Sequence, residues 1–492
     1  MSLPHKKSAR RRPLSLDDIT IVDRQLVHRS VGATALGNAM EWFDFGVFSY
    51  IAVTLGKVFF PSSSPGAQLI ATFATFAAAF VVRPLGGAVF GPLGDRIGRQ
   101  RVLALTMIMM ALGTFAIGLI PGYDRIGIAA PLLLLVARLV QGFSTGGEYG
   151  GAATFVAEFA PDRRRGFLGS FLEFGTLTGY ILGSAVVTLL SMALGEARML
   201  AWGWRVPFLI AGPLGLVGLY MRLKLEETPA FKKQADASEA QREKPRMAEM
   251  LRKQLRPMLQ CIGLVLVFNV ADYMLLSYMP SYLSSTLSYD AAHGLLQILL
   301  VMIVMMPLTL LAGRLSDRIG RRPVILAGCA GLLLLAYPAL MLVRTGSTPL
   351  IFAGLMIMGV ALSCFTGAMP SALPALFPTP VRFGALAIGF NVSVSLFGGT
   401  TPLAAAWLVE KTGNAWMPAF YLMVAGVIGG IAAWSTPETA RRPLKGSGPA
   451  VDSHAHAREI VAASEAAHRA ATEDAAAAEA ASSSSVPGKP AH

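Results

Sequence analysis

The chain has 492 residues, of which 54% are hydrophobic and only 14% are charged. About a quarter of the residues of an ordinary soluble domain are charged, so this composition excludes a soluble globular protein. A formal net charge of +13 would suit nucleic-acid binding, but the basic residues gather in short connections between apolar stretches, which argues against it.

The first 31 residues are polar and basic, without the apolar core and small-residue cleavage site of a signal peptide, and we expect a cytoplasmic N-terminal tail, residues 1–31. Apolar stretches of about 20 residues, long enough to cross a bilayer, then recur along the chain. These stretches predict twelve membrane-spanning helices at about residues 32–55, 67–93, 102–120, 129–157, 167–194, 204–223, 257–286, 293–313, 323–343, 349–376, 383–409 and 415–434. The predicted fold class is therefore an all-α membrane protein.

One long hydrophilic loop, residues 224–256, divides the twelve helices into two halves. We expect an N-terminal six-helix bundle over residues 32–223 and a C-terminal six-helix bundle over residues 257–434. Residues 435–492 are rich in Ala, Ser, Glu and His and are expected to form a largely disordered cytoplasmic tail, in which an alanine-rich stretch could be helical.

The positions of lysine and arginine predict the orientation of the chain. One set of connections and both tails hold 34 of the 42 basic residues, whereas the connections on the other side hold 5. Basic residues favour the cytoplasmic side, so both termini and the central loop are expected in the cytoplasm, facing the lipid headgroups there, some of which are anionic. This distribution explains the net charge without a nucleic-acid partner.

A short sequence occurs once in each half. "GPLGDRIGRQR" at residues 91–101 returns as "GRLSDRIGRRP" at residues 313–323, between the second and third spans of each half. Two related halves are typical of two-lobed secondary transporters. Asp95 and Asp317 can each cap a helix start or pair with a nearby arginine, and such contacts would gate the cytoplasmic side. The gating candidates are Arg83, Asp95, Arg96, Arg99, Asp317, Arg318 and Arg321.

The repeated loop resembles the signature loop of the major facilitator superfamily, which implies the major facilitator fold. "LGNAMEWFDFGVF", "QGFSTGGEYGGAATFVAEFAPDRRRGFLGS" and "LEETPAF" resemble its metabolite:proton symporter branch. "CIGLVLVFNVADYMLLSYMPSYLS" and "FNVSVSLFGGTTPLAAAWLVE" are similar to bacterial osmoprotectant:proton symporters that carry proline and glycine betaine. This resemblance covers roughly residues 30 to 445 and implies an osmoregulatory importer in the bacterial inner membrane. Asp272 departs from the pattern, where an uncharged residue is usual, and leaves substrate preference open.

Acidic residues inside the spans are the candidates for proton coupling. A charged side chain at the centre of a bilayer costs about 2.5 kcal/mol or more, so such residues usually face a polar cavity. Glu41 and Asp44 are three residues apart and share a helix face. They can carry a proton, or one can simply pair with Arg83 or Arg138. The full set of candidates is Glu41, Asp44, Glu148, Glu173 and Asp272.

Aromatic and polar residues of the spans are the candidates for substrate binding. A quaternary ammonium group has no N–H to donate and binds best to aromatic faces. A carboxylate suits the planar guanidinium of an arginine. Arg138 can serve that purpose or can pair with an acid, and the aromatic rings can equally be packing groups. The candidates are Asn38, Trp42, Phe45, Arg138, Asn269, Tyr273 and Asn391.

These features predict a proton-coupled secondary transporter that imports zwitterionic compatible solutes by alternating access. We expect its partners to be a small zwitterionic solute, a proton and membrane lipid, and we expect a monomer. No G-x-x-x-x-G-K-[ST] loop, metal-ligand cluster or nucleophile–base arrangement is apparent, so neither a cofactor nor an enzyme is expected. The alternative is a proton symporter of a carboxylate such as 2-oxoglutarate or citrate, although acids outnumber arginines within the spans.

Overall fold

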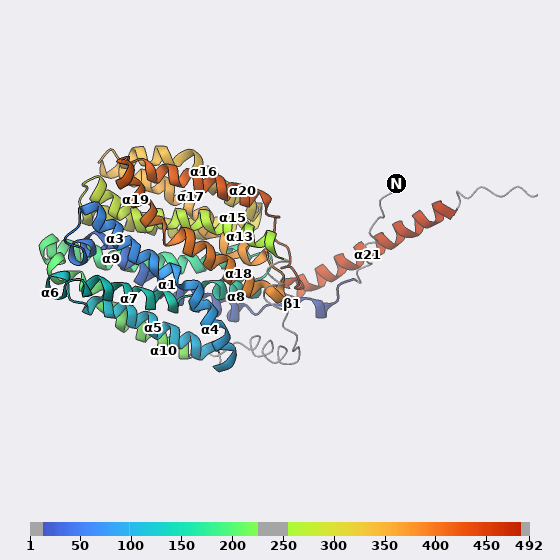
Figure 1. The fold of residues 1–492 in the computed structure, drawn as a ribbon. Helices are drawn as coiled ribbons and strands as arrows, with labels where there is room; N and C mark the ends of the chain where they lie inside the picture. Colours follow the sequence, from blue (N-terminus) through green and yellow to red (C-terminus); the bar gives the residue numbers. More distant parts are fainter. Residues whose placement is uncertain (1–12, 98, 147, 225–253, 484–492) are drawn as a thin grey trace, which may run out of the picture.

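The computed structural model describes residues 13–483 except positions 98, 147 and 225–253, so the central loop lies outside the described residues. It is a bundle of long helices with both tails at one end, which we call the terminal end (Figure 1). The N-terminal half contains α1 (Arg24–Tyr50), α2 (Ala52–Phe59), α3 (Pro65–Val81), α4 (Arg83–Ile97), α5 (Arg99–Leu119), α6 (Tyr123–Ile126), α7 (Ala129–Ser144), α8 (Glu148–Phe159), α9 (Arg165–Arg198), the π-helix η2 (Met199–Gly203) and α10 (Arg205–Lys224).

The C-terminal half repeats this plan with more interruptions. It contains α13 (Leu255–Asp272), the π-helix η3 (Tyr273–Tyr278), α14 (Met279–Ser281), the π-helix η4 (Tyr282–Thr286), α15 (Ala291–Ile319), α16 (Arg321–Val343), α17 (Thr348–Ala375), α18 (Thr379–Ser393), the π-helix η5 (Val394–Gly398), α19 (Thr401–Thr412) and α20 (Met417–Ser435). The π-helical turns fall in the first and fifth spans of this half, next to the polar centre described below.

The membrane-spanning pattern agrees with the sequence-based prediction. Within the described residues, nine helices are long and apolar enough to cross a membrane, and α1 with α2 makes a tenth span bent by 60°. Two shorter apolar helices, Leu105–Leu119 and Arg205–Leu216, occupy the third and sixth predicted positions. Each of the twelve predicted positions therefore holds an apolar helix, and the all-α membrane fold is confirmed.

Close backbone contact between α1 and α9 fixes the position of the opening span. A Cβ atom on Gly175 would lie 2.2 Å from the carbonyl oxygen of Ala35, and one on Gly179 would lie 2.2 Å from that of Ala39. Only glycine permits this approach, as is common between membrane helices. The contact holds the Ala35 and Ala39 face of α1 against α9, which itself packs against α15 and α17 of the other half.

The two tails meet at the terminal end, which differs from the expectation of a largely disordered C-terminal tail. The strands β1 (Thr20–Ile21) and β2 (Ala450–Val451) pair in parallel, and the 3-10 helix η1 (Leu16–Asp18) precedes β1. A long helix, α21 (His454–Ser483), then extends away from the bundle (Figure 1). Residues about 430 positions apart in the chain form these contacts, so local composition alone does not reveal them.

Candidate functional site

The first functional pair joins α1 to α4. A guanidinium nitrogen of Arg83 lies 2.8 Å from a carboxylate oxygen of Glu41, and both side chains are almost completely buried. The Arg83 guanidinium also lies over the rings of Phe80 and Phe45, with its central carbon 4.5 Å and 4.9 Å from the ring centroids. The sequence left two roles open for the acids of α1: carrying a proton, or pairing with Arg83 or Arg138. In the structure, Glu41 forms an ion pair with Arg83.

Asp44 lies in a separate chain of hydrogen bonds. The Thr114 hydroxyl donates to Asp44 over 2.8 Å, and the Gln141 amide donates to Thr114 over 3.0 Å. The amide oxygen of Gln141 in turn accepts a hydrogen bond from Arg138. Four residues from α1, α5 and α7 thus connect a buried acid to a buried base without a direct ion pair between them.

Arg138 is enclosed by aromatic rings. Its central guanidinium carbon is 4.2 Å from the centroid of Phe48, 5.0 Å from Phe76 and 5.1 Å from Phe45. Two of its nitrogens, Nε and Nη2, have no hydrogen-bond partner among the described residues. A buried guanidinium with free donors is suited to bind an anionic group such as a carboxylate.

Aromatic side chains from both halves meet beside this arginine. The ring centroid of Trp42 lies 5.3 Å from Tyr180, 5.8 Å from Tyr273 and 6.0 Å from Phe45. Tyr273 belongs to η3 of the C-terminal half, so the group spans the junction between the halves. Within the described part of the chain, Trp42 Nε1 and the Tyr273 hydroxyl are buried without a hydrogen-bond partner.

Two further acids lie near these rings. The Tyr149 hydroxyl donates to Glu173 over 2.5 Å, while its ring stacks on Phe390 of the other half with centroids 4.0 Å apart. Asp272 is buried and, among the described residues, makes no hydrogen bond or ion pair. Asp272 is close enough to Glu173 for the two carboxyl groups to repel each other, and it also interacts electrostatically with Tyr180.

The three asparagine candidates bind mainly to backbone. Asn38 donates to the carbonyl of Leu172 and to the hydroxyl of Thr176, which again joins α1 to α9. Asn269 donates to a carbonyl one turn earlier in its own helix. Asn391 donates over 2.7 Å to the carbonyl of Gly146 in the opposite half. Asn38 and Asn391 therefore hold helices together in this conformation.

Apart from Arg83, which pairs with Glu41, the gating candidates whose side chains the structure describes lie at the terminal end. Both carboxylate oxygens of Asp317, in α15, accept hydrogen bonds from the main-chain N–H groups of Gly166 and Phe167, at 2.7 Å and 2.8 Å. Asp317 thus caps α9 of the opposite half, which is the capping role weighed for it from the sequence. Arg321 donates to the carbonyl of Ser371, whereas Arg318 is exposed.

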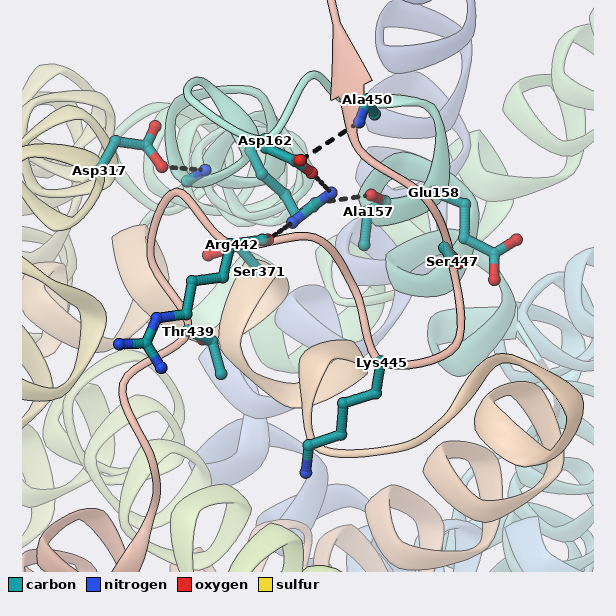
Figure 2. Close-up of polar contacts among 12 residues, drawn as sticks. Ala157, Glu158, Asp162, Asp317, Ser371, Thr439, Arg442, Lys445, Ser447 and Ala450 are labelled. Atoms are coloured by element: carbon teal, nitrogen blue, oxygen red, sulfur yellow. Dashed lines mark hydrogen bonds and ion pairs between the residues drawn. The ribbon is translucent and has the colours of Figure 1, made fainter. Parts of the chain in front are cut away.

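Other charged residues extend this contact across the two halves. Arg382 of α18 binds Glu158 of α8 over 2.6 Å. Within the N-terminal half, Arg165 binds Asp162 and the carbonyl of Ala157, and Figure 2 labels these two partners. The terminal end is therefore closed in this structure. The side chains of Asp95, Arg96, Arg99 and Glu148 lie outside the described residues, so their predicted roles stay predictions.

Several residues of the site escaped the sequence analysis. Thr114, Gln141, Tyr149 and Tyr180 each contact a candidate acid or the aromatic group, but hydroxyl, amide and tyrosyl side chains are common in membrane helices. The signal that could have identified Gln141 is its spacing of three residues from Arg138 on one helix.

Two helical halves that enclose buried charges and aromatic groups at their junction define a secondary membrane transporter. Sequence comparison agrees, since the model of the sugar (and other) transporter family matches residues 31–448. The chain belongs to this family.

Curated relatives extend over almost the whole chain. It is 52% identical over 457 residues to the proline/betaine transporter of Escherichia coli K12, covering 92% of this chain and 91% of the relative. It is also 52% identical over 462 residues to the glycine betaine/proline/ectoine/pipecolic acid transporter OusA of Dickeya dadantii, covering 92% of each. These relatives confirm a transporter rather than an enzyme.

Solved structures confirm the major facilitator fold. The proton:xylose symporter XylE bound to 6-bromo-6-deoxy-D-glucose superposes with a TM-score of 0.66 at 19% identity, covering 85% of this chain and 98% of that chain. A D-xylose–proton symporter structure gives a TM-score of 0.65 at 21% identity, covering 86% and 100%. At this identity the likeness establishes the fold alone.

Proposed function

We propose that the protein is a proton-coupled symporter that imports zwitterionic compatible solutes such as proline and glycine betaine, and that it serves osmoregulation. The observation that carries the proposal is the junction between the halves, where aromatic faces and unpartnered donors lie together. Trp42, Tyr180 and Tyr273 offer faces to a quaternary ammonium group. The free nitrogens of Arg138 and the indole N–H of Trp42 suit the solute's carboxylate.

The buried acids support proton coupling. Asp272 has no ion-pair partner among the described residues, and Asp44 is bound by a neutral hydroxyl. A buried carboxyl group without a fixed counter-charge can take up and release a proton as the conformation changes around it. Glu173 is bound in the same way by Tyr149, so the junction holds several such groups. The names of the relatives agree with the class of solute.

Transport in right-side-out membrane vesicles tests the proposal. An imposed inward proton gradient should drive accumulation of radiolabelled glycine betaine and proline, and an uncoupler should abolish it. ATP without a gradient should not support uptake. Accumulation of 2-oxoglutarate or citrate in place of the zwitterions would favour the alternative, a carboxylate:proton symporter. Solute uptake that is independent of the proton gradient would refute proton coupling.

We further propose that the protein works as a monomer in the bacterial inner membrane, without a cofactor, and with both termini in the cytoplasm. The excess of basic residues at the terminal end supports this orientation and a contact with anionic lipid headgroups. Protease cleavage of the tails in inside-out but not right-side-out vesicles would test the orientation.

A further inference from the structure

The segment after α20 crosses the terminal end of the bundle and touches both halves (Figure 2). We call residues 442–451 the strap. Leu444 of the strap is only 4% exposed and packs between Ala157 of α8 and Ala375 of α17. The strap therefore fills the seam that must widen if the two halves part at this end.

One part of the strap is fixed to the C-terminal half. The carbonyl oxygen of Lys445 accepts hydrogen bonds from the main-chain N–H of Thr379 and from Arg382, each over 3.0 Å. The Lys445 ammonium donates to the carbonyl of Leu376 over 3.0 Å, and the hydroxyl of Ser447 lies 2.8 Å from that of Thr379. These contacts anchor residues 445–447 to the start of α18.

The next part is fixed to the N-terminal half and to the N-terminal tail. The carbonyl of Ala450 accepts from the main-chain N–H of Asp162 over 2.9 Å, and its own N–H donates to the Asp162 carboxylate over 3.1 Å. On the other edge, the carbonyls on either side of Ala450 accept from the N–H groups of Thr20 and Val22, each over 2.9 Å. The strand β2 of the strap thus lies between the α8–α9 loop and β1 and is hydrogen-bonded to both.

The two anchors are close together in the chain. Only Gly448 and Pro449 separate Ser447 from Ala450, and three residue steps span at most about 10 Å when fully extended. The connection has little slack, so the halves cannot move far apart at this end while both anchors hold.

We propose that the strap and the N-terminal strand β1 together fasten the terminal end of the transporter in its closed state. One anchor must release each time this end opens, so the two tails set how readily it opens. The inference rests on alternating access in the proposed function, and it assigns a gating role to the paired tails themselves.

Gly448 offers a specific way to weaken the fastening. A Cβ atom there would lie 2.0 Å from the main-chain oxygen of Asp18, so Gly448→Ala should push the strap away from the N-terminal tail. Gly384→Ala is the matched control, since Gly384 lies in α18 and a Cβ atom on it would have nothing within 4 Å. A second variant that lacks residues 2–22 removes β1 altogether.

Opening is measured with a cysteine introduced at a buried position of α15, outside the strap. Ser316 of α15 is fully buried, and its hydroxyl would lie 2.5 Å from a Cβ atom on Gly166 of α9. Ser316→Cys is introduced after Cys261, Cys329 and Cys364 are replaced, and its alkylation by a water-soluble maleimide is followed in purified protein in nanodiscs. Labelling rates should rise about fivefold in Gly448→Ala and in the tail deletion, the effect of losing one or two hydrogen bonds.

The control Gly384→Ala should label at the parent rate. A rise in either strap variant but not in the control supports the proposal. Unchanged labelling in both strap variants would show that the strap does not limit the opening of the terminal end. An equal rise in the control would show that the substitutions destabilise the bundle in general. Either result overturns the proposal. The labelling experiment contains no solute, so its result does not depend on which solute the protein carries. An error in the proposed solute specificity would be detected in the uptake experiment instead.

Discussion

Glu41 and Arg83 form an ion pair with 2.8 Å between oxygen and nitrogen, and the two side chains are 4% and 2% exposed. Removing one partner of a buried pair leaves an uncompensated charge and costs about 3–5 kcal/mol. We expect Glu41→Gln or Arg83→Gln alone to lower the thermal stability of the purified protein strongly and to abolish uptake.

The double variant Glu41→Gln/Arg83→Gln separates stability from transport. It leaves no unpaired charge, so most of the lost stability should return. If the pair only holds α1 against α4, uptake should return with it, whereas persistent loss of uptake at restored stability would assign the charges to transport. Single variants with parent stability would contradict the buried pair.

The bond between Thr114 and Asp44 predicts a split between coupling and binding. Asp44→Asn preserves shape but removes a titratable group, so we expect loss of gradient-driven accumulation while counterflow exchange of solute remains. Thr114→Ser keeps the hydroxyl that donates to Asp44 over 2.8 Å and should transport normally. If Asp44→Asn still accumulates solute against its gradient, the proton-carrying group must be another acid, namely Glu41, Glu148, Glu173 or Asp272.

Trp42 should distinguish betaine from proline. Its ring lies against Tyr180 and Tyr273, so a bound quaternary ammonium would meet several aromatic faces. Affinity for glycine betaine should fall in the order Trp, Phe, Leu at this position, by roughly five- to thirty-fold for a desolvated cation–π contact of about 1–2 kcal/mol. Proline has N–H donors for a carboxylate and should lose less. Unchanged betaine affinity in Trp42→Leu would show that the ring only packs.

Glu438 predicts a pH-dependent contribution to stability at the terminal end. Burial alone would raise the pKa of this carboxyl group, but main-chain N–H groups of Ala440, Arg321, Arg322 and Thr439 outweigh burial and hold its pKa below the usual 4.5. A lowered pKa stabilises the folded state above pH 4.5, and that contribution is lost as pH falls through the lowered value.

Glu438→Gln should therefore lower the melting temperature at pH 7, by the equivalent of about 1 kcal/mol for a lost helix cap. The difference from the parent should shrink as the pH falls below 4.5. Glu459→Gln, at an exposed position of α21, is the control and should not change the melting temperature. A difference that stays constant with pH would rule out the carboxylate as the source of the stabilisation.

The spans were predictable because each needs only an apolar stretch of sufficient length, and the two halves because a hydrophilic loop and a repeated motif separate them. The charged residues were predictable because an acid inside a span is costly and stands out. The partners of these charged residues were harder to predict. Glu41 had Arg83 and Arg138 as alternatives, and only the packing of α1 against α4 distinguishes them.

Contacts between the halves were beyond the reach of the sequence. Asp317 could be predicted to cap a helix, but not to cap α9, because 150 residues separate it from Phe167. The pairing of β1 with β2 depends on two residues in each strand, too few to give an alternating pattern. Thr114 and Gln141 carry no charge, so their connection between Asp44 and Arg138 follows only from the geometry.

The π-helical turn of η3 has a consequence for how the junction tolerates change in chain length. A π turn accommodates an extra residue relative to an α-helix, so Asp272 before η3 and Met279 after it are not in α-helical phase. Deleting one residue within Tyr273–Tyr278 would remove the extra residue and let the turn become α-helical, with the span beyond it facing nearly as before. Winding the same six residues as a regular α-helix would instead rotate everything beyond them by about 100°, and Tyr282 would turn away from its present neighbours, although the hydropathy of the span would be unchanged. The orientation of this wall of the site therefore depends on residue number as much as on residue type.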